Sequence, residues 1–506
     1  MKNITTKLLA LALVFALCFS FAGCSLFGQG GNGGNGGNGG NGGNGGNSGP
    51  SKPDNLAYED GADNLKGITN DTIWVGNTAG TTGPLSSIGK PFNLGINAAF
   101  AAYNAQGGYN GKSIALKHYD DFGVSSNSIS LLDKLLFEDE VFAIVGHFGS
   151  YAVDATLDTL KDEEIPMIYA AAGNATLLNE AASSVGDKGI VPIQPLNVTE
   201  GRMLILRAFA PADKGGLAGK KVGVISNSNE ASKALLSGIK AEATDSKLDN
   251  IIYQEVASAD YTGAVNALKS AGCDVVVLTV IGADFLTALT TMADVNYLCS
   301  VLTSYNNASA AVFNQDNVMI PAYEKIFSTM AIFTQAWLDI TSTTYTYNED
   351  TPLNAAYKAL SELYGLEYTG TAGFNEEYWT VAENIYNYAL TVDPTTAFAM
   401  SYDAYALAGY IAGDLFCQAM EVLEKSGEDL SRHNLIAAME SQEFKLAMSG
   451  TLSFAHGMRS GVSSFALTAF FDTALLPEGA TPYHAASSAT VHGLTSIEEY
   501  RAILAK

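Results

Sequence analysis

The strongest constraint on the fold is an alternation of short β-branched runs with longer amphipathic stretches, which begins near Ile68. Strands that alternate with helices of about 10–15 residues indicate βαβ units and parallel sheets. The run Asp274–Thr279 is apolar on both alternations, as expected for a strand that helices cover on both faces. We therefore predict an α/β fold.

The strand candidates fall into two series. The first series is Thr72–Gly76, Ser113–His118, Phe142–Val145 and Pro166–Ala170. The second series is Lys221–Ser226, Ile251–Val256, Asp274–Thr279, Cys299–Thr303 and Ile326–Ala331. The helix candidates between them are Pro91–Tyr103, Ser125–Leu136, Ala152–Lys161, Ala231–Ala243 and Gly263–Ala271. Two series predict two Rossmann-like lobes, with a break at Val191–Pro195, where two prolines interrupt the pattern.

The first 23 residues are typical of a lipoprotein signal peptide. Lys2 and Lys7 precede an apolar run, Leu8–Phe21, which is shorter than the ~20 residues of a membrane span. The small residues before Cys24 resemble a bacterial lipobox, in which that cysteine is diacylated. An ordinary cleaved signal with an incidental cysteine is the alternative.

A Gly/Asn-rich flexible linker follows the lipidated cysteine, and we assign residues 24–66 to the two together. About 20 such residues reach roughly 25 Å, which is enough to hold a domain away from a membrane. We therefore predict a protein anchored by lipid to the extracytoplasmic face of the cell membrane.

Composition narrows the choice of partners and chemistry. A formal net charge of -25 leaves no basic face for phosphates, so we expect no nucleic acid partner. The sequence has no G-x-S-x-G, H-E-x-x-H, Walker or C-x-x-C motif, and its histidines lack the spacing of metal ligands. We predict no catalytic residue, no metal and no cofactor. Cys273, Cys299 and Cys417 are expected to be buried thiols, although a Cys273–Cys299 disulfide stays open.

Several segments in register resemble the branched-chain amino acid-binding proteins, which are type I periplasmic binding proteins of ABC importers. A loop, T-A-G-T-T-G-P, follows the first strand, and a helix ends in N-A-Q-G-G-Y-N-G. The segments that carry the resemblance are Thr78–Pro84, Ile96–Gly111, His118–Asp121, Val141–Ser150, Ile165–Gly173, Asp260–Thr262 and Gly450–Phe454. Together they extend from about Ile68 to Asp472.

The resemblance implies two lobes joined by a three-segment hinge, with a small molecule held in the cleft between them. It places lobe 1 at residues 67–195 and 331–448, and lobe 2 at residues 196–330 and 449–506. Residues 345–394 exceed what the family needs, and we predict extra helices on lobe 1 there.

The function that this resemblance implies is an ABC importer's solute-binding lipoprotein, which captures an amino acid or related compound. Its partners would be the small molecule, the permease subunits of the transporter and the membrane. Three alternatives stay open: a tethered domain that presents its solute to a membrane receptor, an enzyme, and a surface protein that binds nothing small.

The resemblance also places a ligand site at the carboxyl ends of the strands. In amino acid-binding members the residue that matches Ser150 holds the ligand carboxylate, and a helix N-terminus beside it suits a negative group. A plain helix cap is the other interpretation of Ser150. The predicted ligand-binding set, which includes residues from both lobes, is Ser150, Gly149, Ala171, Ala172, Gly173, Thr82, Tyr151 and Ser258.

The sequence departs from amino acid binders at several of these positions. Gly173 stands where they carry threonine, and Ser258 stands where they place the acidic residue that neutralises the ammonium group. Asp260 or Asp284 could supply that acid instead. The family's first-lobe disulfide is missing, because glycines occupy both matching positions, Gly123 and Gly149. His147 and Phe148 are candidates either for stacking on the ligand or for structural packing.

Overall fold

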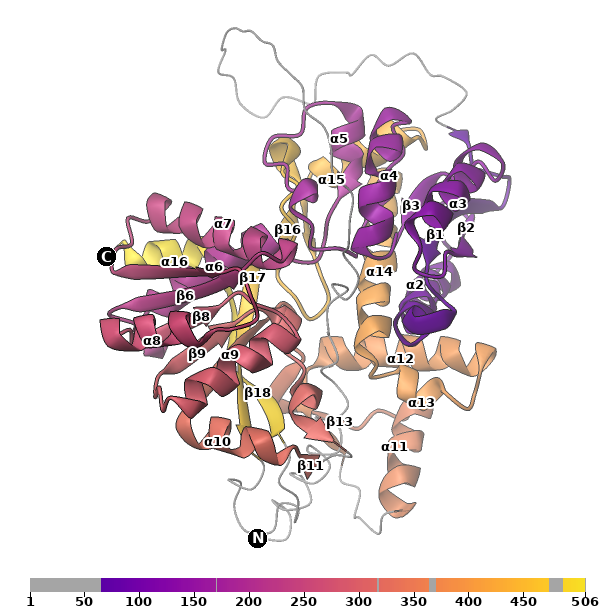
Figure 1. The fold of residues 1–506 in the computed structure, drawn as a ribbon. Coiled ribbons are helices and arrows are strands. Elements are labelled where there is room, and N and C mark those ends of the chain that lie inside the picture. Colours follow the sequence, from indigo (N-terminus) through magenta and orange to yellow (C-terminus); the bar gives the residue numbers. More distant parts are fainter. Residues whose placement is uncertain (1–64, 170, 316–317, 364–369, 473–485, 506) are drawn as a thin grey trace, which may run out of the picture.

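The computed structural model describes residues 65–505, apart from 170, 316–317, 364–369 and 473–485. The predicted signal peptide, Cys24 and nearly all of the linker lie outside the described residues. Within them the chain forms two lobes, each built on its own sheet (Figure 1). The fold class predicted from the sequence is therefore confirmed.

The first lobe is built on a five-stranded parallel sheet with the order β2-β1-β3-β4-β5. Its strands are β1 (Thr72–Ala79), β2 (Ser113–Asp120), β3 (Ala143–Val145), β4 (Met167–Ile168) and β5 (Ile190–Val191). Its helices are α2 (Ser86–Ala105), α3 (Ser125–Phe137), α4 (Ser150–Asp162), α5 (Val185–Gly189), α14 (Ala404–Ser426) and α15 (Arg432–Glu440). The buried side chains of α2 and α14 cover one face of the sheet, and those of α3 and α4 cover the other.

The second lobe is built on a seven-stranded sheet with the order β18-β17-β12-β9-β8-β6-β7. Its strands are β6 (Val222–Asn227), β7 (Ile251–Val256), β8 (Val275–Leu278), β9 (Ser300–Thr303), β12 (Ala331–Ala336), β17 (Ser464–Asp472) and β18 (Ala486–Ser496). The pairs β12–β17 and β17–β18 are antiparallel, and the other described pairs of this sheet are parallel. Its helices are α6 (Asn197–Phe209), α7 (Glu230–Asp245), α8 (Thr262–Ala271), α9 (Ala283–Asp294), α10 (Pro321–Thr329) and α16 (Ile497–Leu504).

The predicted strand Ile326–Ala331 is wrong. Pro321 at the first helical position and Glu324 in the first turn start a helix there, α10, and the strand β12 begins only at Ala331. Because β12 pairs with β9, it belongs to the second sheet. The chain therefore returns to lobe 1 after Ala336 and not at residue 331.

The second predicted return, at residue 449, also lies too early. The strand β16 (Thr451–Ser453) pairs with β15 (Glu443–Lys445), directly after α15 of lobe 1. The Arg459 guanidinium then binds the carbonyl oxygen of Lys188 in lobe 1. Backbone pairing thus keeps the chain on lobe 1 until about residue 460, and β17 in the second sheet starts at residue 464.

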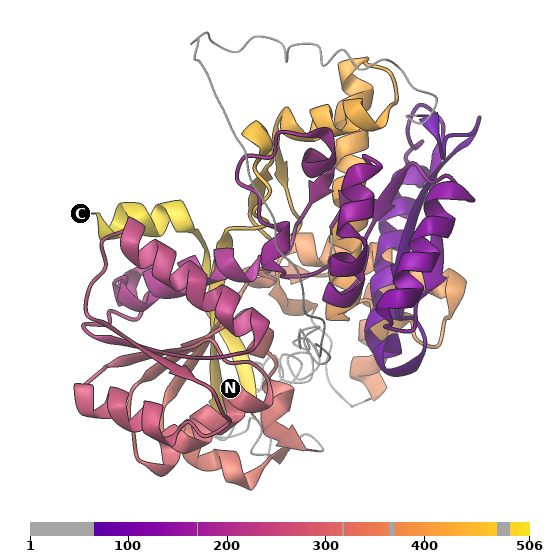
Figure 2. The same cartoon turned by 45° about the horizontal axis from the view of Figure 1, so that its top comes forward.

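Three segments, 192–196, 337–340 and 460–463, connect the lobes (Figure 2). The Val462 N–H donates to the Ile193 carbonyl at 2.8 Å, so the first and third segments pair directly. Within the second segment, the Asp339 N–H donates to the Met448 carbonyl of lobe 1 at 2.7 Å. The lobes therefore meet through a hydrogen-bonded hinge, and the buried apolar cluster of lobe 1 continues across it to Met203 and Leu206 of α6.

The residues around the predicted insertion at 345–394 form a small module on lobe 1. Its elements are β13 (Thr341–Tyr347), α11 (Pro352–Leu363), β14 (Thr371–Phe374), α12 (Glu376–Val392) and α13 (Ala397–Met400). The helix α12 packs against α2 and α14, as predicted for extra helices on the first lobe. The rings of Tyr347 and Trp379 stack 4.2 Å apart at the centre of the module.

The long helix α14 is the core helix of lobe 1. Among the described helices it alone is long and apolar enough to cross a membrane, but most of it is buried against the rest of the lobe. It packs on α2 through small residues, because a Cβ atom added at Gly409 would lie 1.9 Å from the Phe92 carbonyl oxygen. The backbones of the two helices therefore come into direct contact.

Gly409→Ala should destabilise the protein, because a methyl group at this contact overpacks the interface, which typically costs about 1–3 kcal/mol. The matched control is Gly263→Ala in α8, where an added Cβ meets no atom within 4 Å. That variant should be neutral or slightly stabilising, by no more than about 1 kcal/mol. Chemical unfolding of both variants checks this, and equal midpoints would contradict the close packing of α2 on α14.

Candidate functional site

The carboxyl-end edges of the two sheets meet at Asn197, the first residue of α6. Its backbone N–H donates to the carbonyl oxygen of Gly173, after β4, at 3.0 Å. Its side-chain oxygen accepts from the Asn306 amide, after β9, at 3.3 Å. We call these two hydrogen bonds the Asn197 junction. In open α/β sheets ligands bind at the carboxyl ends of strands, so the junction marks the base of the candidate site.

Ser150 is the first residue of α4, directly after β3 and its loop. Gly149 occupies the cap position, and its carbonyl oxygen accepts from the N–H groups of Ala152 and Val153. The Ser150 hydroxyl makes no hydrogen bond with any described residue, and its side chain is half-buried. Ser150 is therefore not a plain helix cap, and its hydroxyl can bind a partner from outside the chain.

Gly149 is required by the geometry of this turn. Its φ of 92° lies in the region that favours glycine. A Cβ atom there would come within 2.5 Å of the Tyr151 ring. The glycine thus allows Tyr151 to fold back beside the start of α4.

The hydroxyl groups of Tyr151 and Thr82 are both bound by carboxylates at the carboxyl end of β2. Tyr151 donates to Asp121 Oδ1 at 2.8 Å, and Asp121 also accepts from the Ser128 hydroxyl at 2.9 Å. Thr82 donates to Asp120 Oδ2. These bonds order the rim of lobe 1, and any contact of Thr82 or Tyr151 with a ligand stays a prediction.

Behind this rim lies a chain of side-chain hydrogen bonds that was not predicted from the sequence. His118 Nδ1 lies 2.9 Å from Asn77 Oδ1, whose amide nitrogen donates to Asn93 Oδ1 at 2.8 Å and to the Gly146 carbonyl at 3.1 Å. Its outer end is the Thr81 hydroxyl, 3.0 Å from His118 Nε2. The chain fixes the loop after β1 against the end of β3.

His147 and Phe148 are packing residues of lobe 1. The His147 ring is fully buried with its Nε2 atom 2.9 Å from the Thr156 hydroxyl, and burial lowers the pKa of the ring to about 4. Phe148 packs on Phe92 with ring centroids 5.0 Å apart. Neither ring is exposed at the candidate site.

Ala171 and Ala172 are buried, and Gly173 is half-buried beside Asn197. Ala171 has a left-handed φ of 43°, which turns the chain sharply after β4. A Cβ atom at Gly173 would come 3.0 Å from Asn197 Oδ1. The glycine that replaces the usual threonine therefore leaves room for the Asn197 side chain.

Ser258 lies on the exposed loop after β7, the edge strand of the second sheet. Since β6 and β8 separate β7 from β9, the structure does not bring Ser258 to the Asn197 junction. Of the two alternative acids, Asp260 lies just before α8 and accepts from the Thr262 N–H at 2.9 Å. Asp284, at the start of α9, is half-buried and accepts from the Asn227 amide at 2.8 Å.

A fully buried carboxylate, Glu200, lies behind the junction on the first turn of α6. It accepts from the Ser304 hydroxyl at 2.6 Å and from the Tyr305 N–H at 2.7 Å. Burial raises the pKa of this carboxyl to about 7, although both hydrogen bonds act to lower it. The sequence gives no signal for this residue, because a glutamate in a first helical turn normally faces water.

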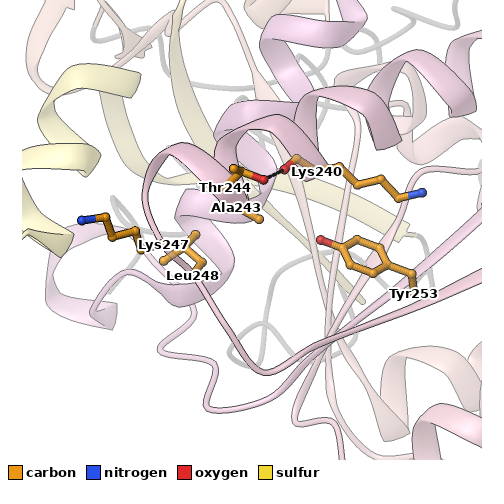
Figure 3. Close-up of a pocket in the computed structure, with 6 residues that line it drawn as sticks. All are labelled: Lys240, Ala243, Thr244, Lys247, Leu248 and Tyr253. Carbon is orange, nitrogen blue, oxygen red and sulfur yellow. Dashed lines mark hydrogen bonds between the residues drawn. The ribbon is translucent and has the colours of Figure 1, made fainter.

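A hollow of about 510 Å³ on lobe 2 lies away from these strand ends (Figure 3). It is lined by Lys240, Ala243, Thr244, Lys247, Leu248 and Tyr253. Lys240, Ala243 and Thr244 lie on the second half of α7, which starts at the carboxyl edge of the sheet and ends at the opposite edge, and Lys247 and Leu248 follow it. The hollow is therefore not part of the candidate site.

The described residues contain no group of three or more His, Cys, Asp or Glu side chains that could hold a metal ion. Cys273, Cys299 and Cys417 are free thiols, so the structure contains no Cys273–Cys299 disulfide. The chemistry available at the strand ends is that of neutral donors, amides and carboxylates. Such groups recognise a polar solute by hydrogen bonds.

Comparison with known proteins gives a consistent result. The sequence profile of the family described as periplasmic binding protein matches residues 72–365. The Leu/Ile/Val-binding protein homolog 2 of Brucella abortus is 29% identical over 215 residues, which are 40% of this chain and 53% of that protein. The chain thus spans about half the length of the relatives it matches.

Two solved structures share the fold. An ABC transporter substrate-binding protein from Sphaerobacter thermophilus is 15% identical, with a TM-score of 0.54 over 84% of this chain and 98% of that one. A fatty acid ABC transporter substrate-binding protein from Thermomonospora curvata is 16% identical, with a TM-score of 0.52 over 86% of this chain and 95% of that one.

Proposed function

The chain belongs to the periplasmic binding protein family, and from this premise we propose that it is an extracytoplasmic solute-binding lipoprotein of an ABC importer. It captures a small polar solute, an amino acid or a related compound, between its two lobes and presents it to the permease subunits. The relatives and structural neighbours named above are binding proteins, which supports a binding role over an enzymatic one.

The observation that carries this proposal is the Asn197 junction. It brings the loop after β4 of one lobe and the loop after β9 of the other to the same residue. A solute bound there would contact both lobes, so binding would favour one arrangement of the two. The connecting segments lie outside both sheets, so that arrangement can change without breaking either sheet.

A thermal-shift screen tests solute capture. A ligand that binds only the folded protein adds about 2.7 kcal/mol of stability at a hundredfold excess over Kd, which is a shift of a few degrees in a protein this large. The library covers amino acids, their amides, nucleosides, aromatic acids and fatty acids. A complete lack of shifts at high concentration would remove the support for this function.

Ser150→Ala separates ligand binding from folding. Loss of one hydrogen bond to a charged ligand group costs roughly 1.5–3 kcal/mol, so affinity for a solute found in the screen should fall about 10- to 150-fold. The melting temperature should stay nearly unchanged, because Gly149 and not Ser150 occupies the cap. Ser130→Ala, which removes an exposed hydroxyl from α3, is the control. If Ser150→Ala bound the solute with unaltered affinity, the ligand site would not lie at the start of α4.

The lipid anchor is tested by Cys24→Ala. If Cys24 carries the lipid, this variant should leave the detergent phase and appear in the medium or as an uncleaved precursor. Cys18→Ala changes a cysteine within the apolar run of the signal and should not alter the partitioning. A Cys24→Ala protein that still partitions into detergent would rule out lipidation at this residue.

A further inference from the structure

Two hydroxyl groups at the rim of lobe 1 have no hydrogen left for a ligand. Thr82 donates its hydrogen to Asp120 Oδ2, and Tyr151 donates to Asp121 Oδ1 at 2.8 Å. A hydroxyl has one hydrogen and two lone pairs, so an oxygen that has given its hydrogen away can bind a further group only by accepting. Both oxygens therefore act as acceptors toward a ligand.

The Thr81 hydroxyl points its hydrogen inward as well, and the direction of its bond follows from Asn77. The Asn77 side-chain nitrogen faces the Gly146 carbonyl at 3.1 Å, and a backbone carbonyl can only accept. Asn77 Oδ1 is then the atom 2.9 Å from His118 Nδ1, so Nδ1 carries the hydrogen. In the neutral ring Nε2 is the acceptor, so Thr81, 3.0 Å away, donates to it.

The direction of the Thr81 bond requires a neutral His118 ring. Burial lowers the pKa of this ring below its ordinary value, although the nearby carboxylates of Asp120 and Asp121 act to raise it. A protonated ring carries hydrogens on both nitrogens and would reverse the bond. At neutral pH and above, the Thr81 oxygen is thus a third acceptor of the rim.

Two carboxylates behind the rim make its local charge negative. Asp120 and Asp121 form no ion pair with any described residue. Asp120 already accepts from the N–H groups of Thr81 and Phe122, at 2.9 and 3.0 Å. Asp121 is fully buried and accepts from three donors of lobe 1. The carboxylates therefore act on a ligand through their charge, while the hydroxyl oxygens make the contact.

A place for an anionic group lies next to this rim. Ser150 is the first residue of α4, and its hydroxyl makes no hydrogen bond with any described residue. The N-terminus of a helix favours a negative group. Tyr151, the next residue, is bound to Asp121, so the start of α4 and the rim are joined directly. Lobe 1 thus presents donors for an anion and, beside them, acceptors for a cation.

We propose that the rim of lobe 1 recognises a primary ammonium group of the solute. The oxygens of Thr81 and Thr82 accept its hydrogens, and Asp120 and Asp121 supply the compensating negative charge. An ammonium group has three hydrogens to donate and no lone pair, so it fits a surface made of acceptors. The inference rests on the proposed function and narrows its solute to an amino acid or another amine that also carries an anionic group.

This arrangement replaces the acid that is missing at Ser258. An ammonium group that loses its water without a negative partner is costly. The sequence comparison placed that partner in lobe 2, whereas the rim provides it in lobe 1. A fatty acid or an aromatic acid without nitrogen brings no donor to the rim, so its oxygens would face lone pairs and two like charges.

The first test compares matched solutes. Thermal shifts of the full chain are measured with each protein amino acid and, for each one that binds, with the 2-hydroxy acid of the same side chain. The 2-hydroxy acid should bind about 10- to 150-fold more weakly, because it loses hydrogen bonds from a charged group. Equal affinity for the two solutes would overturn the inference.

Variants of the rim connect this preference to its residues. Thr82→Val keeps the shape of threonine and should weaken binding of the amino acid about 10- to 150-fold. It should also reduce the preference for the amino acid over its 2-hydroxy acid, which a loss of folded protein would not change. Thr81→Val should act in the same way, whereas Thr81→Ser, which keeps the hydroxyl, should bind normally. Thr380→Val, at an exposed position of α12, is the control. An unchanged preference in both valine variants of the rim would contradict the assignment.

A second measurement needs no solute. With isotope-labelled histidine, the nitrogen NMR spectrum of the full chain shows which ring nitrogen of His118 carries the hydrogen. It is recorded at about pH 8, above the ordinary pKa of histidine, and the signal that His118→Gln removes identifies the ring. The hydrogen should lie on Nδ1. A hydrogen on Nε2 would reverse the Thr81 bond and overturn the inference.

The outcomes separate the failure of the inference from the failure of the proposed function. If no compound of the solute screen shifts the melting temperature, the proposed function fails, and ammonium recognition fails with it. If acids without nitrogen bind and amines do not, solute capture stands and the inference alone fails. If amino acids bind and their 2-hydroxy acids bind more weakly in the Thr82 protein only, both are supported.

Discussion

The hydrogen-bonded hinge is the constraint on which the rest of the structure depends. Two sheets are joined by three short segments, and the pairing of Val462 with Ile193 fixes the first and third of these against each other. Because these backbone groups are already paired, the hinge can bend only by small changes in the segments themselves. Any solute-dependent change must therefore act at the strand ends beside the hinge, where Asn197 lies.

Much of the fold follows from local pattern. The strand Ile251–Val256 has the bounds predicted for it, and α3 and α4 begin within two residues of their predicted starts. Hydrophobic periodicity records which face of an element is buried, and that is enough for such elements. It does not record which sheet a strand joins, because that is decided by hydrogen bonds to distant residues.

The lobe boundaries show this limit. The apolar run after Pro321 continues from α10 into β12, and nothing in its composition separates a helix from a strand. Two contacts decide the boundaries: β12 pairs with β9, and Arg459 donates to the Lys188 carbonyl. Both join residues that are far apart in the sequence. The family resemblance gave the number of crossings, and these contacts gave their positions.

The residues of the candidate site, like the lobe boundaries, were predicted from the sequence only in part. A serine after a glycine at a strand-to-helix turn marks Ser150, and the structure places it at the start of α4. Thr82 and Tyr151 are bound by Asp120 and Asp121, which lie 38 and 30 residues away in sequence. Ser258 was chosen because the family resemblance aligns it with the acid that neutralises the ammonium group, and strand order puts it on the far edge of its sheet.

Asn197 and Glu200 escaped prediction for a different reason. Both lie in the first turn of an amphipathic helix, where polar residues normally face water. They are buried only because the hinge brings the end of β9 over this turn. Polar residues that the tertiary fold turns inward leave no mark in a periodic pattern, and in this protein they lie at the base of the candidate site.

The buried groups His147 and Glu200 also act on stability with opposite signs. The folded-state pKa of His147 is lowered from 6.5 to about 4, so its contribution to stability is complete above about pH 6.5 and is lost as the pH falls toward 4. The folded-state pKa of Glu200 is raised from 4.5 to about 7, so its contribution is complete below about pH 4.5 and is lost as the pH rises toward 7.

Between about pH 4.5 and 6.5 these two contributions change in opposite directions by similar amounts, because both pKa values shift by a similar extent. Their sum is therefore nearly flat in this window, although each group titrates strongly by itself. One group lies in each lobe, so a change of pH acts on the two lobes with opposite signs although the sum of these two contributions is nearly flat. Asp414 in lobe 1 adds to this balance: burial raises the pKa of its carboxyl to about 6, so its contribution, like that of Glu200, is lost as the pH rises.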